Sequence, residues 1–314
     1  MTDEQQDRDW AASPNHHLIE SSSDDFPALL KQIPGAPQRL YVIGNLDALH
    51  LPSLAIVGSR NPTEQGRQNA YEFAKHLGRS GFCIVSGLAQ GIDTAAHVGA
   101  LDGGAMTVAF LGHGIDQIYP AANNKLAGRI AAQGVICSEF PLGAQPRREH
   151  FPQRNRLISG LSLGTLVVEA ARRSGSLISA RLAAEQGREI FAIPGSIHNP
   201  MSRGCHQLIR QGAKLVESAA DIVSELGPLA GHLMQTPDEP AASFESVSEQ
   251  DTDYEMLLHI MGFDPATTDE LAARSGLTID QVSSMLLILE LEGKIEAHAG
   301  GRYSRLNNKL DTAK

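Results

Sequence analysis

The sequence predicts an α/β fold: a Rossmann-like, doubly wound and mostly parallel sheet, followed by a small C-terminal winged-helix domain. Short apolar runs of strand length recur along the chain, and helix-like segments such as 64–80 and 176–188 separate them. This alternation is typical of a parallel sheet with helices on both faces, whose ligand site lies at the carboxyl ends of the strands. The apolar runs are 54–58, 82–86, 106–112, 134–139, 165–170 and 189–195.

Composition divides the chain into four parts. Residues 1–50 are mostly polar, and we expect partial disorder up to about Ser23, followed by an ordered lead-in. Residues 51–226 carry the strand and helix alternation. Residues 227–250 are rich in Pro, Ser and acidic residues without periodicity, which is typical of a linker. Residues 251–307 predict three helices and a Gly-turned β-hairpin, the pattern of a winged helix.

Several classes of protein are disfavoured by composition. No apolar run reaches the roughly 18 residues of a membrane-spanning helix, and the acidic N-terminus is unlike a signal peptide, so no membrane association is expected. The three cysteines, Cys83, Cys137 and Cys205, form no C-x-x-C pair, so neither a disulfide framework nor a zinc site is indicated. Their scatter in the sequence favours the reducing cytoplasm.

The net charge of −10 hides an uneven distribution. Residues 51–226 hold 17 Lys and Arg against 13 Asp and Glu, whereas the rest of the chain holds 9 against 23. Because the local field decides whether phosphate is attracted, the α/β domain is compatible with nucleic acid. The C-terminal unit, residues 251–307, has an excess of acidic residues and is expected to bind DNA weakly or not at all. Binding of another protein is at least as good an interpretation of this unit.

Two turns at the predicted carboxyl edge are suited to an anion. The first strand ends in Gly58, Ser59 and Arg60, which supply backbone N–H groups, a hydroxyl and a guanidinium. The second strand ends in Ser86 and Gly87 and leads into a helix. The G-x-G-x-x-G dinucleotide fingerprint and its acidic partner are missing, so no cofactor is expected. The alternative at the first turn is a tight βα connection with a solvated Arg.

The basic segment QPRREHFPQRNR, residues 145–156, is the most informative stretch. It follows a predicted strand and carries four arginines against one acid, with a Phe and a His between them. Guanidinium groups for phosphate and ring faces for base stacking are typical of single-stranded nucleic acid recognition. The alternative is a solvated charged loop. The candidate DNA-binding residues here are Arg147, Phe151, Arg154, Asn155 and Arg156.

A third turn, formed by Ser174, Gly175 and Ser176, opens a helix directly after Arg172 and Arg173. One of the two serines is expected to cap that helix. The same N–H and hydroxyl groups add donors to the predicted edge, so a groove is a better interpretation than isolated caps.

Catalytic and metal-binding signals are poor. The sequence has no G-x-S-x-G elbow, no H-E-x-x-H and no Walker A motif, and no spacing selects a triad. We interpret Asp93 as a helix cap and His97 as a packing or hydrogen-bonding residue. Glu139 and Glu169 end strands, and structural roles are expected for both. No catalytic residue and no metal ligand is therefore predicted.

Together these motifs resemble the DprA/Smf family, the DNA-processing protein A group. The resemblance covers about half of the chain in the family's order, which makes it far more specific than any one motif. It is carried by IVGSR (56–60), SGLAQGIDTAAHVGAL (86–101), LGHGIDQIYP (111–120), SEFPLGAQP (138–146), FPQRNRLISGLS (151–162), VVEAARRSGSLISARLAAEQGREIFAIPGS (167–196) and GCHQLIRQGAKLV (204–216).

The resemblance implies a cytoplasmic, non-enzymatic protein that binds single-stranded DNA in natural transformation, protects incoming DNA, loads RecA onto it and forms homodimers. It implicates Arg60 and the FPQRNR segment, with Phe151 stacking on a base and Arg154 and Arg156 neutralising phosphate. Members usually begin with a helical SAM-like domain, of which residues 1–50 are expected to hold only a remnant. Gln153 stands at a position that is often basic in relatives.

Two other functions compete with this one. The first is a Rossmann-like nucleotide-binding hydrolase of the lysine-decarboxylase-like group, whose P-G-G-x-G-T-x-x-E motif binds phosphate and supplies a catalytic Glu. Here Gly164 and Thr165 are followed by Glu169 one residue too late, and no Pro-Gly-Gly precedes them. The second is a nucleotide-sensing module that uses the same strand-end pocket without DNA.

Overall fold

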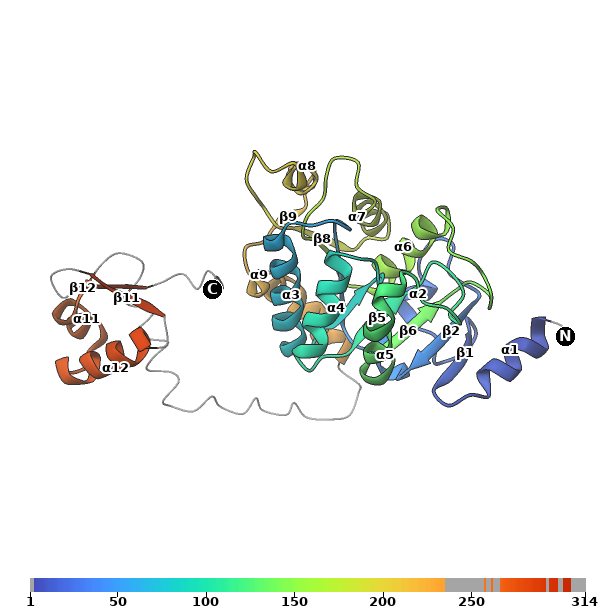
Figure 1. Cartoon of the computed structure of the whole chain (residues 1–314), viewed down its shortest axis with the longest axis horizontal. Helices are drawn as coiled ribbons and strands as arrows, with labels where there is room; N and C mark the ends of the chain where they lie inside the picture. The colour runs from blue at the N-terminus through green and yellow to red at the C-terminus, as the bar shows by residue number, and fades with distance from the viewer. Residues whose placement is uncertain are drawn as a thin grey trace. The chain divides into compact units, whose positions relative to one another are not determined.

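The computed structural model describes residues 3–234, 257, 261, 266–291, 294–298 and 302–305. The chain divides into two compact units between Glu239 and Pro240. The first unit is built on a nine-stranded sheet of order β1-β2-β6-β5-β4-β3-β7-β8-β9 (Figure 1). Its strands are β1 (His16–Glu20), β2 (Arg39–Gly44), β3 (Ser53–Val57), β4 (Cys83–Ser86), β5 (Thr107–Phe110), β6 (Val135–Ser138), β7 (Gly164–Val167), β8 (Glu189–Ala192) and β9 (Lys214–Leu215).

The sheet is mostly parallel and doubly wound, as predicted. Strands β3 to β9 run parallel, whereas β1 and β2 form an antiparallel pair that joins the sheet beside β6. The chain moves outward from β3 to β6 on one side and from β7 to β9 on the other. The strand order therefore reverses between β3 and β7, and the carboxyl ends of these strands are where a ligand is expected.

Helices cover both faces of the sheet (Figure 1). One face packs against α3, α4 and α9, and the other against α2, α6, α7 and α8. The helices are α1 (Asp3–Ala11), α2 (Ala28–Lys31), α3 (Glu64–Arg79), α4 (Ile92–Asp102), α5 (Asn124–Gln133), α6 (His150–Leu161), α7 (Ser176–Glu185), α8 (Arg203–Arg210) and α9 (Ala219–Met234), with short 3-10 helices η1 (Leu46–Leu49), η2 (Ala121–Asn123) and η3 (Pro200–Ser202).

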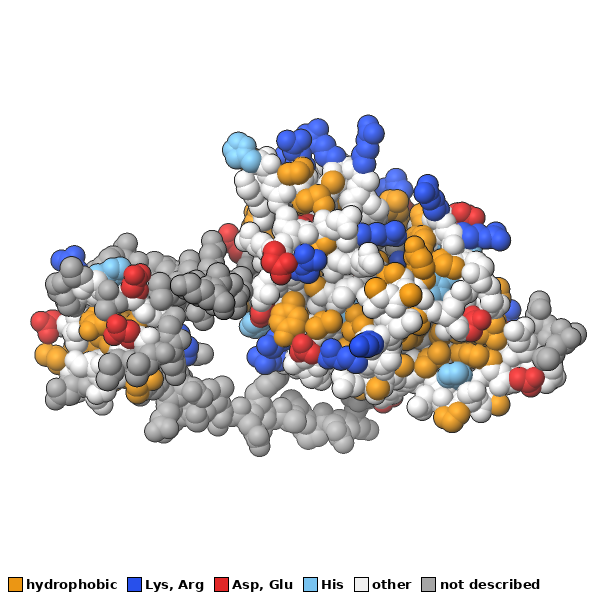
Figure 2. All heavy atoms as spheres, in the orientation of Figure 1, with side chains coloured by type: hydrophobic (Ala, Val, Ile, Leu, Met, Phe, Trp, Pro, Cys, Tyr) orange, Lys and Arg blue, Asp and Glu red, His pale blue; other side chains and the backbone are white. Residues whose placement is uncertain are grey.

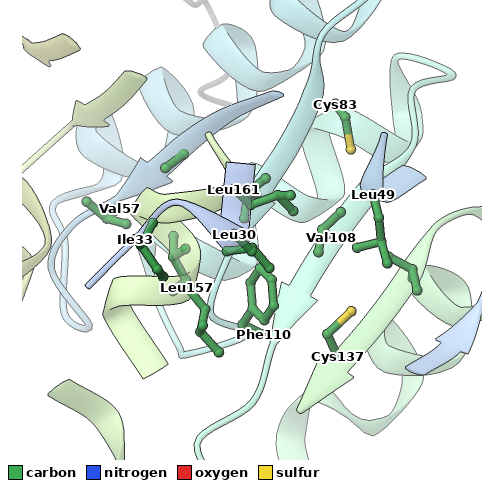
Figure 3. Close-up of a cluster of buried hydrophobic side chains, with 14 of the residues drawn as sticks. Leu30, Ile33, Leu49, Val57, Cys83, Val108, Phe110, Cys137, Leu157 and Leu161 are labelled. Carbon is green, nitrogen blue, oxygen red and sulfur yellow. The ribbon is translucent and has the colours of Figure 1, made fainter. Parts of the chain in front are cut away.

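Alternation along the strands feeds two separate hydrophobic clusters. On β3, Leu54 and Ile56 point into the cluster under α3 and α4, whereas Ala55 and Val57 point into the opposite one. Figure 3 shows part of that opposite cluster, where Phe110 of β5 lies among apolar side chains of α2 and α6. A strand buried on both faces reads as a continuous apolar run, which is why the sequence identified these strands.

The expected disorder up to Ser23 is wrong, because this segment contains α1 and β1. All five residues of β1 pair with β2. Asp7 of α1 is buried and accepts hydrogen bonds from Tyr41 Oη at 2.8 Å and Arg39 Nη1 at 2.9 Å. The ring of Trp10 stacks on His16 with centroids 4.6 Å apart. These contacts extend the sheet by two strands and leave the N-terminal segment ordered.

The C-terminal unit contains α11 (Thr268–Ser275), α12 (Ile279–Leu291) and a three-stranded sheet of β10 (Ala266–Thr267), β12 (Arg302–Arg305) and β11 (Ile295–His298). The first helix expected here lies mostly outside the described residues, although Leu257 and Met261 are buried in this unit's own core. The predicted linker also starts later than expected, because α9 continues to Met234. No helix in the described ranges is both long and apolar enough to cross a bilayer.

Candidate nucleic-acid interface

A groove of about 820 Å³ lies at the carboxyl ends of β3 and β7, where the strand order reverses. We call it the strand-end groove. Figure 2 shows that Lys and Arg side chains gather along the upper border of this unit, over α6, α7 and α8. Loops after β3, β5 and β7 contribute to the groove, together with the first turns of α6 and α7. Its polar and aromatic lining includes Ser59, Arg60, Asn61, Asp93, Tyr119, Arg148, Phe151, Arg154, Asn155, Arg173, Ser174 and Ser176.

The exposed Arg60 and the half-exposed Phe151 lie together in the groove. The Arg60 guanidinium carbon lies 5.0 Å from the centroid of the Phe151 ring, a cation–π distance. Tyr119, which is 51 % exposed, lies beside Phe151 with ring centroids 6.3 Å apart. A guanidinium and two aromatic rings on one surface can bind a phosphate and contact base faces together.

The first turn is held tightly beneath this pair. Ser59 is buried, its N–H donates to the Glu169 carbonyl at 2.8 Å, and its hydroxyl accepts from Asn61 N at 3.1 Å. A Cβ on Gly58 would lie 2.6 Å from the side chain of Ile92, so only glycine fits there. Of the three predicted residues in this turn, Arg60 alone presents an exposed side chain to a ligand.

The second turn is used inside the protein. Ser86 Oγ donates to the Ile56 carbonyl at 2.7 Å and is fully buried. Gly87 N donates to Asp93 at 3.2 Å, and the Gly87 carbonyl accepts from Arg154. The prediction that this turn offers free anion donors is therefore wrong for both residues, because their polar groups already have partners.

Arg154 is the most buried of the predicted phosphate ligands, at 3 % exposure. Its Nη1 donates to the carbonyls of Gly87 at 2.5 Å and Phe110 at 2.6 Å. Burial lowers the pKa of Arg154 to about 10, while the nearby Asp93 carboxylate opposes that shift, so the guanidinium stays charged at neutral pH. Arg154 borders the groove, but its two hydrogen bonds join the loop after β4 to the end of β5.

Asp93 completes this internal arrangement and does not cap its helix. The N-cap of α4 is Gly91, and the Asp93 carboxylate accepts from Gly87 N and from Ala89 N at 3.3 Å. Burial raises the pKa of Asp93, and the charge of Arg154 acts in the opposite direction. His97, predicted as a packing residue, is fully buried with its Nδ1 2.8 Å from Thr107 Oγ1.

Arg156 does not line the strand-end groove. Its guanidinium forms a two-pronged pair with Glu139, with Nη2 2.5 Å from Oε2, and its Nε donates to the Gly35 carbonyl at 3.1 Å. The side chains of Arg156 and Glu139 are only 19 % and 15 % exposed. The expectation that Arg156 neutralises phosphate is corrected, because the carboxylate of Glu139 already neutralises the charge of Arg156.

The basic segment starts as a loop but continues as a helix. From His150 onward the segment is α6, so the alternative of a solvated charged loop does not hold for that part. Arg147 and Arg148 precede the helix and are both exposed, and only Arg148 borders the groove. Asn155, half-buried on α6, lines it as well.

The third turn opens α7 toward the groove. Ser174 and Ser176 hydroxyls lie 2.7 Å apart, and Ser176 N donates to Ser174 Oγ at 3.3 Å. Gly175 has open space around it and is exposed. The amino-terminal end of a helix favours anions, so this turn, with the exposed Arg173 before it, extends the basic lining.

Tyr119 was not predicted at this surface, and Arg148 and Arg173 were noted only as neighbours of the predicted site residues. Tyr119 had an accessible signal, because it lies after β5 and therefore at the same edge as the other strand-end loops. The expected structural role of Glu169 fits its contacts: it accepts from Thr63 N at 2.9 Å and from Thr63 Oγ1 at 2.6 Å, at the start of α3. Among the described residues, no cluster of three or more His, Cys, Asp or Glu side chains could hold a metal ion.

A doubly wound sheet with arginines and aromatic rings gathered at its topological switch point defines a Rossmann-like protein with a candidate anion site. The chain belongs to the DNA recombination-mediator protein A family, whose model matches residues 17–227. A second model, the DprA winged helix domain, matches residues 235–301. The family resemblance read from the motifs is thereby confirmed.

Curated relatives agree with this assignment. Protein Smf of Escherichia coli is 45 % identical over 95 % of this chain and 79 % of its own length. DNA processing protein DprA of Streptococcus pneumoniae is 48 % identical over 64 % of this chain and 71 % of its own.

Two solved structures are similar as well. The X-ray structure of the S. pneumoniae protein has a TM-score of 0.67 and 44 % identity, covering 72 % of this chain and 78 % of that one. DNA processing protein A of Helicobacter pylori, described for its single-stranded DNA binding mode, has a TM-score of 0.61 and 31 % identity, covering 68 % and 96 %.

Proposed function

We propose that this chain binds single-stranded DNA in the strand-end groove with little sequence preference. The observation that carries the proposal is the exposed Arg60 guanidinium over the Phe151 ring, with the exposed Tyr119 ring beside it. Phosphate neutralisation and base stacking then occur at adjacent points of one surface. Arg148 and Arg173 add positive charge at the groove, and the H. pylori relative supports the same ligand class.

The wider role follows from family membership. We propose that the protein acts in the cytoplasm during natural transformation, where it protects incoming DNA and loads RecA onto it as a homodimer. The Smf and DprA relatives, at 45 % and 48 % identity, support a role in DNA processing.

No catalytic role is proposed for the groove. The carboxylate expected to act in a hydrolase of the lysine-decarboxylase-like type, Glu169, has both oxygens engaged by Thr63 and does not line the groove. Incubating the protein with nucleotides and with DNA, and assaying for products, tests this directly. Turnover that disappears in Glu169→Gln would support the hydrolase instead.

A competition assay separates DNA binding from nucleotide sensing. The protein is bound to a fluorescent oligonucleotide of about 15 bases and challenged with mononucleotides or with unlabelled oligonucleotide. A groove that recruits several phosphates gives displacement by the oligonucleotide alone at comparable phosphate concentration. Equal displacement by a mononucleotide would favour the sensing module.

A further inference from the structure

The loop between β5 and η2 carries Tyr119 to the strand-end groove. It runs from Leu111 to Pro120, and Tyr119, near its end, is 51 % exposed and lines the groove. An exposed ring on a loop has little packing around it and loses conformational freedom when it meets a ligand. A contact that fixes the ring beforehand therefore favours binding, and the interior of this loop contains such a contact.

His113 lies inside this loop, at 1 % exposure. Its Nδ1 lies 2.9 Å from the carbonyl oxygen of Gly114, and the backbone of Tyr119 is a second hydrogen-bond partner of the imidazole. The carbonyl oxygen of His113 itself accepts from Ser138 Oγ, at the end of β6, at 2.6 Å. One buried ring therefore links the start of the loop to the residue that carries the exposed aromatic ring.

The ring of His113 also meets the ring of Tyr119. The two centroids lie 6.4 Å apart with an interplanar angle of 86°, which is an edge-to-face arrangement. The Tyr119 ring lies 6.3 Å from that of Phe151 as well, at an angle of 39°. Tyr119 thus has one ring contact with a buried histidine and another with the aromatic residue of the groove.

These surroundings determine the protonation state of His113. Burial lowers its pKa, and the nearby charge of Arg154 acts in the same direction. Hydrogen bonds to Gly114 and Tyr119 oppose this shift, as does the Asp116 carboxylate, but the net direction is downward. The ring is therefore neutral near pH 7, and its single proton is assigned to Nδ1, because a carbonyl oxygen can only accept. The contact with Tyr119 does not depend on a charge.

The middle of the loop is held independently of the imidazole. Gly114 N and Gln117 Nε2 both donate to the Ala144 carbonyl, at 2.8 and 2.7 Å. These bonds remain when the ring of His113 is removed, so the loop keeps its path. The consequence of losing the ring is then confined to the end of the loop, where Tyr119 lies.

We propose that His113 is a positioning residue for single-stranded DNA binding: it holds the exposed Tyr119 ring beside Phe151, so that the two rings meet a base together. This inference rests on the proposed function and deepens it. His113 is buried and does not line the strand-end groove, so it acts through Tyr119 and not on DNA directly. Its contribution is preorganisation, because a ring that is already oriented loses less freedom on binding.

The test compares His113→Asn, Tyr119→Ala and the double variant with the native full-length chain. Asparagine keeps an amide donor near the position of Nδ1 for the Gly114 carbonyl but has no ring. The probe is an oligonucleotide of about 15 bases that carries the fluorescent base 2-aminopurine at several positions, whose emission falls when an aromatic ring stacks on it. Affinity is measured, and so is the emission at saturating protein, which does not depend on affinity.

We expect each single variant to bind roughly two- to tenfold more weakly, the range that one aromatic contact gives. The double variant should bind no more weakly than Tyr119→Ala. Both single variants should quench the probe less than the native chain at saturation, which a general loss of stability would not produce. The slope of log affinity against log salt should stay unchanged, because no phosphate contact is lost.

A matched control makes the same substitution at another buried histidine. His97→Asn replaces a fully buried imidazole whose Nδ1 lies 2.8 Å from Thr107 Oγ1. It should lower stability and leave the quenching at saturation unchanged. If His113→Asn does not fold, His113→Gln makes the same comparison, because it also has an amide donor and no ring.

Three results would overturn the positioning role: losses of affinity that multiply in the double variant, native quenching by His113→Asn, or native binding and quenching by Tyr119→Ala. Each of them leaves the strand-end groove in place as long as Arg60→Ala and Phe151→Ala weaken binding. If the native chain does not bind the oligonucleotide, the proposed function itself fails.

Discussion

Nη1 of Arg154 donates a hydrogen bond to the carbonyl oxygen of Gly87 at 2.5 Å, and there is no room for a Cβ on that glycine, because it would overlap the same guanidinium. This contact changes the role of an arginine that the sequence assigned to phosphate. Arg154 joins the loop after β4 to the end of β5 from inside the protein. Its guanidinium carbon also lies 6.0 Å from the centroid of the Phe151 ring. Within the protein, the charge that acts favourably on Arg154 is the carboxylate of Asp93.

The first prediction concerns Arg154. In Arg154→Ala the carbonyls of Gly87 and Phe110 lose their donor, so the free energy of unfolding should fall by about 1–3 kcal/mol for each orphaned group. Affinity for single-stranded DNA falls as the loops relax, but the salt slope stays unchanged because no phosphate contact is lost. Chemical denaturation and salt-dependent titration measure the two effects. A slope reduced by about 0.7 would restore the phosphate-contact assignment.

The second prediction contrasts Arg60 with Phe151. Arg60→Ala removes about one phosphate contact, so the slope of log affinity against log salt should drop by roughly 0.7. Phe151→Ala removes stacking, which costs on the order of 1–3 kcal/mol with little change in slope. Both variants should stay folded, because Arg60 is exposed and Phe151 is half-exposed at the groove. Fluorescence anisotropy across a salt series distinguishes them, and identical slopes for the two variants would contradict the division of roles.

The third prediction treats Arg156 and Glu139 as a structural pair. Arg156→Gln and Glu139→Gln should each lower stability, and the double variant should lose less than the sum, giving a positive coupling energy. Neither change should alter the salt slope of DNA binding. Thermal or chemical unfolding of the four proteins completes the cycle. Additive losses would show that the pair contributes nothing, and a lower slope in Arg156→Gln would place this residue on DNA after all.

The fourth prediction concerns pH. Burial, assisted by the charge of Arg154, lowers the pKa of His97 from an ordinary 6.5 to about 3. Between these values the unfolded chain binds a proton that the folded chain does not, so stability is full above about pH 6.5 and falls as the pH decreases toward 3, with a slope approaching about 1.4 kcal/mol per unit.

The comparison that isolates His97 is a His97→Gln variant unfolded at several values between about pH 7 and pH 5. Asp93, whose raised pKa acts in the opposite direction, is present in both proteins and cancels. The variant should show a shallower loss of stability toward acid than the native chain. Parallel curves would mean that His97 titrates normally in the folded state.

The parallel strands could be predicted because their physical signal is local. A strand buried on both faces, such as β3 with Leu54, Ala55, Ile56 and Val57, appears in the sequence as an unbroken apolar run. Strand β1 and helix α1 gave no such signal. Their order depends on distant partners, as in the contact of Asp7 with Tyr41, 34 residues later, and a distant partner leaves no local pattern.

The site shows the same division. That Arg60 would lie at the strand-end edge followed from its position after an apolar run. That Arg154 is buried could have been read from helical spacing, because it shares the buried face of α6 with Leu157, Ile158 and Leu161, at the i, i+3, i+4 and i+7 positions. The pairing of Arg156 with Glu139 could not have been predicted. A loop separates Glu139 from α6, and the sequence does not determine the path of that loop.

The most direct test of single-stranded DNA binding in the strand-end groove is a titration of the intact protein with single- and double-stranded oligonucleotides of the same sequence at two salt concentrations. We expect clearly tighter binding of the single strand, because unpaired bases can reach Phe151 and Tyr119 whereas stacked, paired bases cannot. The preference should persist at the higher salt, where charge contacts weaken and stacking does not. Equal affinity for the two forms, or a preference that vanishes with salt, would contradict it.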